Sequence, residues 1–267
     1  MNAFLAAFWA EALKARRSKV SLLTAPGFLI LPVIGGLFMF ILKDPERARA
    51  MGLIGVKAQL LTGGMANWPA YFDFLSLGTA AGGAILFAFI TAWVFGREFS
   101  DHTAKELLAL PTPRWIIVGA KFVLTALWIL ILTLLIFVFG LGIGAAVDIP
   151  GWSLELAWTS FWSLMTTALL TSMLMPFVAL FASAGRGYLP PIAWAFLTMA
   201  FAQVVGMMGW GDWFPWAVPG LFSLMFSVLY GQRAEQIGMH SYILVLLTFI
   251  AGVAATFAWW RSADQAR

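Results

Sequence analysis

Six long apolar stretches, separated by shorter polar segments, dominate the sequence. A helix needs about 20 predominantly apolar residues to cross the hydrocarbon core of a bilayer, and every stretch is that long. The pattern therefore predicts an all-α, polytopic membrane protein with six transmembrane helices in a single domain of residues 1–267. The predicted spans are residues 20–42, 74–96, 117–147, 156–184, 188–208 and 241–260.

Composition agrees with lipid as the solvent. Hydrophobic residues make up 62% of the chain and charged residues 10%, whereas soluble domains carry about a quarter charged residues. The chain has no cysteine, which excludes disulfides, thiol catalysis and thiolate metal sites. The basic residues are not clustered as in a nucleic-acid footprint, so we expect membrane lipid around the chain and no nucleic-acid partner.

The distribution of Lys and Arg predicts the orientation. Cytoplasmic loops of membrane proteins carry an excess of these residues. An N-terminus in the cytoplasm puts eleven of them inside and five outside, so we expect both termini on the cytoplasmic side of the inner membrane. The inner set is Lys14, Arg16, Arg17, Lys19, Arg97, Lys105, Arg114, Lys121, Arg186, Arg261 and Arg267; the outer set is Lys43, Arg47, Arg49, Lys57 and Arg233. We expect Lys121, near the start of the third span, to extend its ammonium to the membrane surface.

The N-terminal segment, residues 1–19, has an amphipathic pattern. Its positive charges follow the apolar residues, which is the reverse of a cleavable signal peptide. Phe4, Phe8 and Ala12 recur at intervals of four, while Glu11 falls on another face. This predicts an interfacial helix in the plane of the headgroups, acting either as a plain anchor or as a mechanical element.

Residues 97–114 connect the second and third spans on the predicted cytoplasmic side. Thr103 and Glu106 have the spacing of a capping box, so a short helix is expected to begin near Thr103. Its mixed charges and its leucines, among them Leu107, suit the docking of a cytoplasmic partner. A simple cap on a helical hairpin is the alternative that the pattern leaves open.

Residues 209–240 form a second unusual region, before the last span. Trp210, Trp213 and Trp216 crowd together as in an aromatic belt at the outer membrane surface. The apolar run 220–230 that follows is too short to cross the membrane. We therefore expect a re-entrant or interfacial segment on the outer side, which either gates an opening or sets the depth of the chain.

Small and hydroxyl residues inside the spans predict close contacts between helices. Two glycine pairs with GxxxG spacing are expected to pack helices within the chain or across a dimer: Gly78 with Gly82, and Gly140 with Gly144. A stripe of hydroxyl residues on the fourth span predicts either interhelical hydrogen bonds or a translocation path: Thr159, Ser163, Thr167 and Thr171. Pro176, deep in the same span, predicts a kink.

Several kinds of chemistry are absent from the sequence. No GxxxxGK[ST] phosphate loop occurs, so the chain is not expected to bind ATP in that way or to act as an enzyme. His102 and His240 are predicted on opposite membrane faces, as solvated loop residues that cannot share a metal. Gly209–Asp212 matches the GxGD of intramembrane aspartyl proteases, but no second buried aspartate completes the pair. No ionisable residue is expected near the middle of a span, where ion-coupled carriers usually need one.

An N-terminal amphipathic helix, six spans and a broken apolar segment before the last span form a pattern that resembles a known family. It is similar to the permeases of type-2 ATP-binding-cassette (ABC) exporters, in the bacterial group that includes bacitracin- and lantibiotic-resistance permeases. The connector carries the likeness at the level of residues, in Gly96-Arg97-Glu98, Thr103, Leu107-Leu108, Pro111, Arg114 and Lys121.

The resemblance implies an antibiotic-resistance exporter in which the connector is the coupling helix that docks on a separate cytoplasmic ATPase. ATP and Mg would be bound by that partner, with no cofactor in this chain, and two permease chains, identical or homologous, would pair. A secondary transporter or channel without an ATPase, and a membrane scaffold or sensor, are the alternatives. The resemblance assigns the contact with the ATPase to Glu98, Asp101, Thr103, Lys105, Glu106 and Leu107.

Overall fold

The computed structural model describes residues 3–44, 65–108, 111–225 and 237–262, and within these ranges all regular structure is helical. Six helical segments in them are long and apolar enough to cross a membrane, which confirms the predicted all-α class and the number of spans. They are Lys19–Lys43, Trp68–Ser100, Arg114–Ala146, Leu154–Ala184, Leu189–Met207 and Met239–Ser262.

Local sequence signals account for most of the helix boundaries. Ser18 separates α1 from α2 and accepts a hydrogen bond from the amide of Ser21, while Asn67 and Ser153 cap α5 and α9 in the same way. Such caps satisfy amides that a helix start leaves without partners. The elements are α1 Ala3–Arg17, α2 Lys19–Lys43, α5 Trp68–Gly78, η1 Thr79–Gly83, α6 Ala84–Ser100, α7 Ala104–Leu108, α8 Arg114–Ala146, α9 Leu154–Ser172, α10 Met175–Ala184, α11 Leu189–Met207, η2 Gly211–Trp213, α12 Val218–Met225 and α13 Met239–Ser262.

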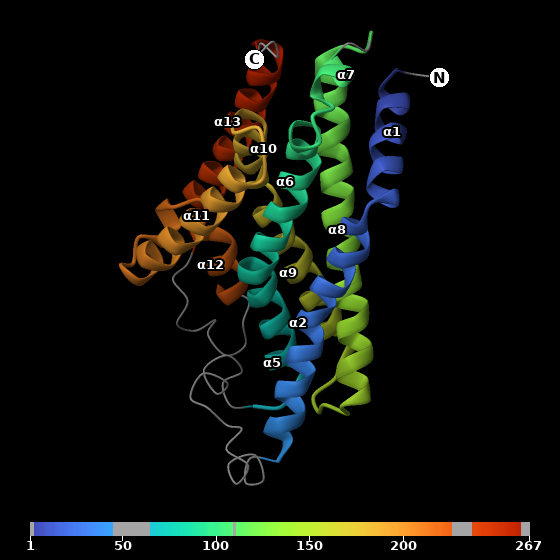
Figure 1. The fold of residues 1–267 in the computed structure, drawn as a ribbon. Coiled ribbons are helices and arrows are strands. Elements are labelled where there is room, and N and C mark those ends of the chain that lie inside the picture. Colours follow the sequence, from blue (N-terminus) through green and yellow to red (C-terminus); the bar gives the residue numbers. More distant parts are fainter. Residues whose placement is uncertain (1–2, 45–64, 109–110, 226–236, 263–267) are drawn as a thin grey trace.

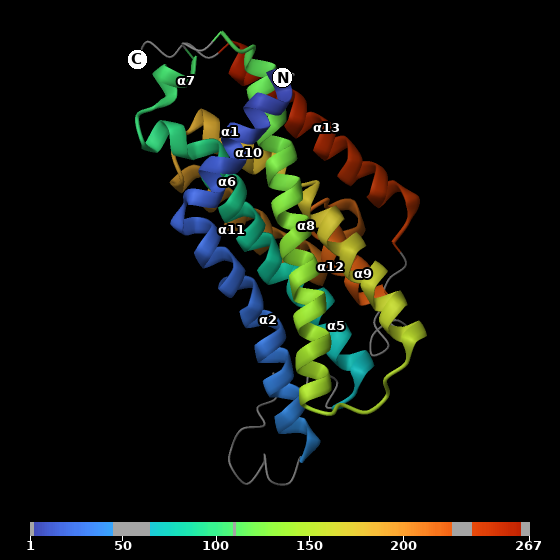
Figure 2. The same cartoon turned by 90° about the vertical axis from the view of Figure 1, so that its right-hand side faces the viewer.

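The helices form an elongated bundle in which α1, α7, the start of α8 and the last turns of α13 lie at one end (Figure 1). We call this the α7 end. α8 is the longest single helix and packs against both α1 and α2, while α10 packs against α6 and α13. Figure 2 shows α13 diverging from α8 with distance from the α7 end. Segments from the two halves of the sequence therefore meet at the α7 end.

Two spans are interrupted at positions with a physical cause. In the second span a π-helical turn, Thr79–Gly83, separates α5 from α6, and such turns are frequent at functional sites. The fourth span breaks at Met173–Leu174, and Pro176 occupies the first turn of α10. The kink predicted from Pro176 is confirmed, because a proline removes an amide hydrogen bond from a helix but is tolerated in a first turn.

Close packing explains three of the four glycines with GxxxG spacing. A methyl group added at Gly78 would overlap Leu31 of α2, and methyl groups at Gly140 and Gly144 would overlap Leu75 and Trp68 of α5. These three glycines pack helices within the chain. The fourth, Gly82, has no atom within 4 Å of an added methyl group and lies on the surface.

The segment before the last span is only partly described, because residues 226–236 lie outside the described ranges. α12 has eight residues and packs against α9 and α5; its re-entrant placement stays a prediction. His240 was expected to be a solvated loop residue. It lies in the first turn of α13 instead of a loop, and its side chain is 37% exposed. Its Nε2 lies 3.0 Å from the Asp212 carboxylate, and its ring stacks on Trp213.

Candidate functional site

A buried ion cluster lies at the α7 end of the bundle, centred on Lys121 of α8. The Lys121 side chain is 0% exposed. Its ammonium donates to the Glu11 carboxylate at 3.0 Å, to both carboxylate oxygens of Glu98 at 2.9 Å, and to the Val94 carbonyl at 2.7 Å. The three acceptor groups match the three donors of an ammonium. The expectation that Lys121 extends to the membrane surface is therefore wrong.

Two further cations complete the cluster at its edge. Lys14 lies 2.6 Å from Glu11 and 3.3 Å from Glu98, and Arg97 lies 3.3 Å from Glu98. The Arg97 guanidinium also lies over the Trp93 ring, 4.8 Å from its centroid. Three basic side chains thus surround two buried carboxylates. Buried charges are costly unless they are paired and hydrogen-bonded, and both conditions hold here.

The cluster joins three segments that are far apart in the sequence. Glu11 belongs to α1, Glu98 to the last turn of α6, and Lys121 to α8 about two turns from its start. The amphipathic pattern of α1 placed Glu11 on a face away from the apolar one. In the structure Glu11 faces the bundle, while Leu5 and Trp9 are exposed. Whether α1 lies in the headgroup plane stays a prediction.

The connector begins directly beside this cluster. α6 ends with the Thr103 amide donating to the Glu98 carbonyl at 2.9 Å, and His102 adopts a φ of 58°. This is the pattern of a Schellman motif, in which a residue in the left-handed region reverses the chain after a helix. α7 then begins at Ala104, where the capping-box spacing predicts it. The last turn of α6, which carries Glu98, is thereby tied to the start of α7.

A surface groove of about 570 Å³ separates α1 from the connector. Its walls carry both signs of charge, with Lys14 and Arg17 on the α1 side and acidic residues on the other. The groove can therefore hold a protein segment that presents charges of both signs around an apolar residue. The lining residues are Lys14, Arg17, Ser18, Arg97, Glu98, Asp101, Thr103, Glu106 and Leu107.

Five of the six residues assigned to the ATPase contact lie on or next to this groove in accessible positions. Asp101, Thr103, Lys105 and Glu106 are exposed, and Leu107 is half-buried against the core. Glu98 differs, because it is 3% exposed and fully engaged in the ion cluster. Glu98 therefore lines the groove with very little accessible surface, and we assign it a positioning role.

The hydroxyl stripe of the fourth span does not form one continuous surface. Thr159 is exposed, whereas Ser163, Thr167 and Thr171 are buried. Thr171 donates to the Thr167 carbonyl, and the Thr167 hydroxyl has no hydrogen-bond partner. Thr159 and Ser163 also line a small cavity of about 90 Å³ beside Asp73.

Sequence reasoning missed the pairing of Glu11 with Lys121. The one signal available was the charge of Lys121 next to an apolar span, which is unfavourable against lipid unless it is paired. That signal asks for a partner of opposite sign but does not identify Glu11 or Glu98 as the partner. Among the described residues, no group of three or more His, Cys, Asp or Glu side chains could hold a metal ion.

Comparisons with known proteins cover the elements that build this site. The family model described as ABC-2 family transporter protein matches residues 7–203, from α1 to α11. The bacitracin transport permease protein BCRB of Bacillus licheniformis is 25% identical over 182 residues, which cover 68% of this chain and 85% of that protein. No solved structure matches the chain.

Proposed function

The chain belongs to the ABC-2 family of transporter proteins and is a transmembrane permease, and from this premise we propose that it is the permease subunit of an exporter driven by a separate cytoplasmic ATPase. The ATPase would bind ATP and Mg, and this chain would carry the path through the membrane. A second permease chain, identical or homologous, would complete the transporter. The exposed Gly82 is a position where such a chain can approach closely.

One observation carries the proposal: the charged groove beside α7 is continuous with the buried ion cluster. Lys14, Arg97 and Glu98 belong to both. A partner that moves α7 would move the last turn of α6, and the cluster would pass that displacement to α1 and α8. Force applied at the groove thus reaches the first three spans through ion pairs and packed helices.

We propose an amphipathic peptide antibiotic or a lipid-like molecule as the exported substrate. The relative from Bacillus licheniformis is described as a bacitracin transport permease, which motivates the first choice. The small cavity beside Asp73, Thr159 and Ser163 is our candidate for a polar part of the path. Transport of bacitracin by vesicles that contain both subunits would test this assignment. If such vesicles transport neither an amphipathic peptide antibiotic nor a lipid-like molecule, the assignment is wrong.

We predict that the α7 end faces the cytoplasm, as the distribution of Lys and Arg favours. Because the chain has no cysteine, single cysteines report their location directly. A membrane-impermeant maleimide should label Glu155→Cys, at the far end of the bundle, on intact cells. It should label Lys105→Cys on α7 only after the cells are permeabilised. The reverse pattern would invert the topology and remove the groove from the ATPase.

The proposed docking is tested by Leu107→Asp. This variant puts a carboxylate where an apolar contact with the ATPase is expected, so recovery of the complex and transport should both fall by at least about ten-fold, which corresponds to the loss of about 1.4 kcal/mol of binding free energy. Recovery is measured by co-purification of the ATPase and transport in reconstituted vesicles.

Leu107 also touches the core, so a second variant separates docking from folding. Glu106→Arg changes an exposed residue of the groove and should weaken the complex while thermal stability stays unchanged. Glu155→Arg, an exposed reversal at the far end of the bundle, is its matched control and should leave the complex intact. Normal complex and transport in both groove variants would mean that α7 only caps a hairpin.

A further inference from the structure

A groove between α8 and α13 opens at the α7 end and is not part of the coupling site. Its outer part has a volume of about 470 Å³ and is lined by Arg114, Trp115, Phe257 and Arg261, among others. The Arg114 guanidinium donates to the carbonyls of Trp260 and Arg261 at 3.1 and 3.4 Å, which joins the two helices here. This part of the groove carries two cationic side chains, Arg114 and Arg261, where the N-terminus of α8 meets the C-terminus of α13. The dipoles of the two helix ends oppose each other here, so the guanidinium groups supply the positive charge.

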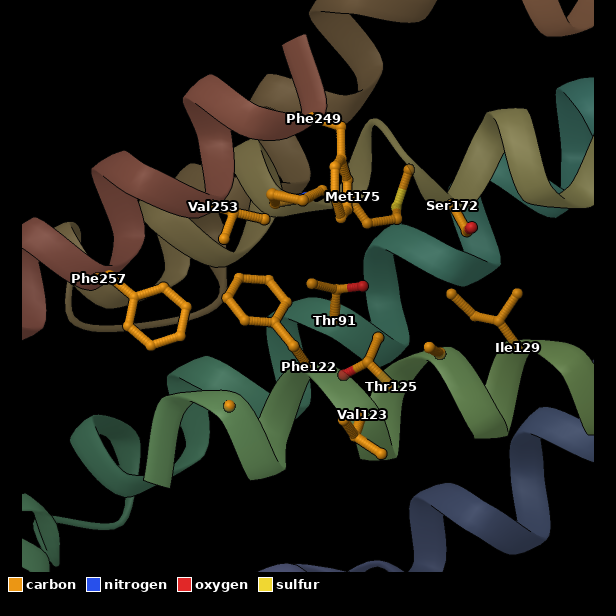
Figure 3. A pocket seen from close by; sticks show the side chains of 13 residues that line it. Thr91, Phe122, Val123, Thr125, Ile129, Ser172, Met175, Phe249, Val253 and Phe257 are labelled. Carbon is orange, nitrogen blue, oxygen red and sulfur yellow. The ribbon is translucent and has the colours of Figure 1, made fainter. Parts of the chain in front are cut away.

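A second cavity, of about 380 Å³, continues from Phe257 toward the middle of the bundle. Figure 3 shows Phe257 and Phe122 facing each other at one side of it, with Met175 and Phe249 on another side. Phe257 lines both cavities, so a cationic cavity and an apolar cavity adjoin at its ring, and we refer to them as the outer and inner parts of one groove. Val123 on its rim is 40% exposed, which leaves the inner part open toward the lipid side of α8.

The inner cavity offers no hydroxyl proton to a polar ligand. Its three hydroxyl residues all donate to carbonyls of their own helices: Thr91 to Phe87, Thr125 to Lys121, and Ser172 to Leu169. The remaining lining is aliphatic, aromatic or thioether. A polar molecule would lose its hydrogen bonds with water here, whereas a hydrocarbon chain would not. Cavities of this character stay dry and accept apolar ligands.

The length of the groove matches one leaflet of a bilayer. Along α8, Phe122 lies eight residues from Arg114 and Ile129 fifteen, which correspond to about 12 and 22 Å at the rise of an α-helix. Half of the hydrocarbon core is about 15 Å thick. The exposed Trp115 lies beside Arg114, where aromatic residues mark the membrane–water boundary. A headgroup at the arginines therefore places its acyl chain at the depth of the inner cavity.

We propose that this groove binds an anionic phospholipid of the surrounding leaflet, with its phosphate at Arg114 and Arg261 and one acyl chain in the cavity beside Pro176. Basic pockets between transmembrane helices on the cytoplasmic side are suited to anionic headgroups. The acyl chain fills the space at the break between α9 and α10, where α13 also packs. The lipid is resident rather than exported, and the inference does not depend on the proposed ATPase.

Photo-crosslinking of the full chain in nanodiscs tests the site. The probes are phosphatidylglycerol and phosphatidylcholine with the same diazirine-bearing acyl chain, and mass spectrometry measures labelling of peptides from α8 and α13. Phosphatidylglycerol should label them at least about five-fold more strongly, and Arg261→Gln should abolish most of that preference. Arg16→Gln, which removes an exposed cation outside the groove, is the control and should leave the preference intact.

A steric variant tests the inner cavity separately. Ala126→Trp fills the cavity that Ala126 lines and should remove labelling there, while the next residue, Leu127→Trp, points outside it and should have no such effect. A contrary result is that both lipids label the protein equally and that neither Arg261→Gln nor Ala126→Trp changes that labelling. This result would show ordinary bulk lipid and would overturn the proposal. Loss of the bound lipid during ATP turnover with the partner would show cargo and overturn it as well.

Discussion

Replacing Lys121 by methionine should destabilise the folded chain by about 3–5 kcal/mol, the cost of removing one partner from a buried ion pair. Glu11 and Glu98 are 4% and 3% exposed. In the variant their carboxylates would lose the ammonium that lies between them, while Lys14 would stay at the edge of the cluster. For a chain of this size the midpoint of thermal unfolding should fall by about 10 °C. Size-exclusion chromatography after heating in detergent measures it.

Two controls separate this effect from a general loss of charge. Lys105→Met removes an exposed cation on α7 and should change stability by no more than about 0.5 kcal/mol. The triple variant Glu11→Gln, Glu98→Gln, Lys121→Met removes all three charges together and should recover much of the loss. Wild-type stability of Lys121→Met alone would show that the cluster does not hold α1, α6 and α8 together.

Gly144→Val should destabilise the chain by about 1–3 kcal/mol, the range for overpacking a filled core. An added side chain at Gly144 would overlap the ring of Trp68. That ring cannot move aside easily, because the Trp68 amide is bonded to the Pro150 carbonyl and the ring packs against Trp152. The same thermal assay measures the change.

Gly142→Val is the matched control, two residues away on the same helix. An added side chain there meets no atom within 4 Å, so stability should be unchanged within about 0.5 kcal/mol. Equal loss in both variants would show that the effect does not come from the contact between α8 and α5. No loss in either would mean that Trp68 has another position available.

The spans could be predicted from the sequence because their signal is local. About 20 apolar residues identify a span wherever it packs, and Pro176 disrupts a helix whatever its neighbours are. The start of α7 follows from Thr103 and Glu106 in the same way. The largest boundary difference is in the second span, which begins at Trp68 instead of residue 74, because the polar Asp73 and Asn67 made its first turns resemble a loop.

The ion cluster could not be predicted, because its pairing depends on contacts across 110 and 23 residues of sequence. Taken alone, Lys121 is an ordinary basic residue near a membrane boundary, and Glu11 is an ordinary polar residue of an amphipathic helix. Each residue is buried only because Lys121 pairs with both Glu11 and Glu98 in the folded chain. For the same reason Glu98 was predicted among the surface residues of the connector, whereas its side chain points into the bundle.

ATP hydrolysis and transport by the purified, reconstituted chain, each measured with and without a cytoplasmic ABC ATPase, test the central claim most directly. The account predicts no hydrolysis by the chain alone, since it lacks a phosphate loop, and predicts ATP-dependent transport once the ATPase is bound at the groove beside α7. Transport by the chain alone, driven by an ion gradient and unaffected by ATP or by the ATPase, would contradict it.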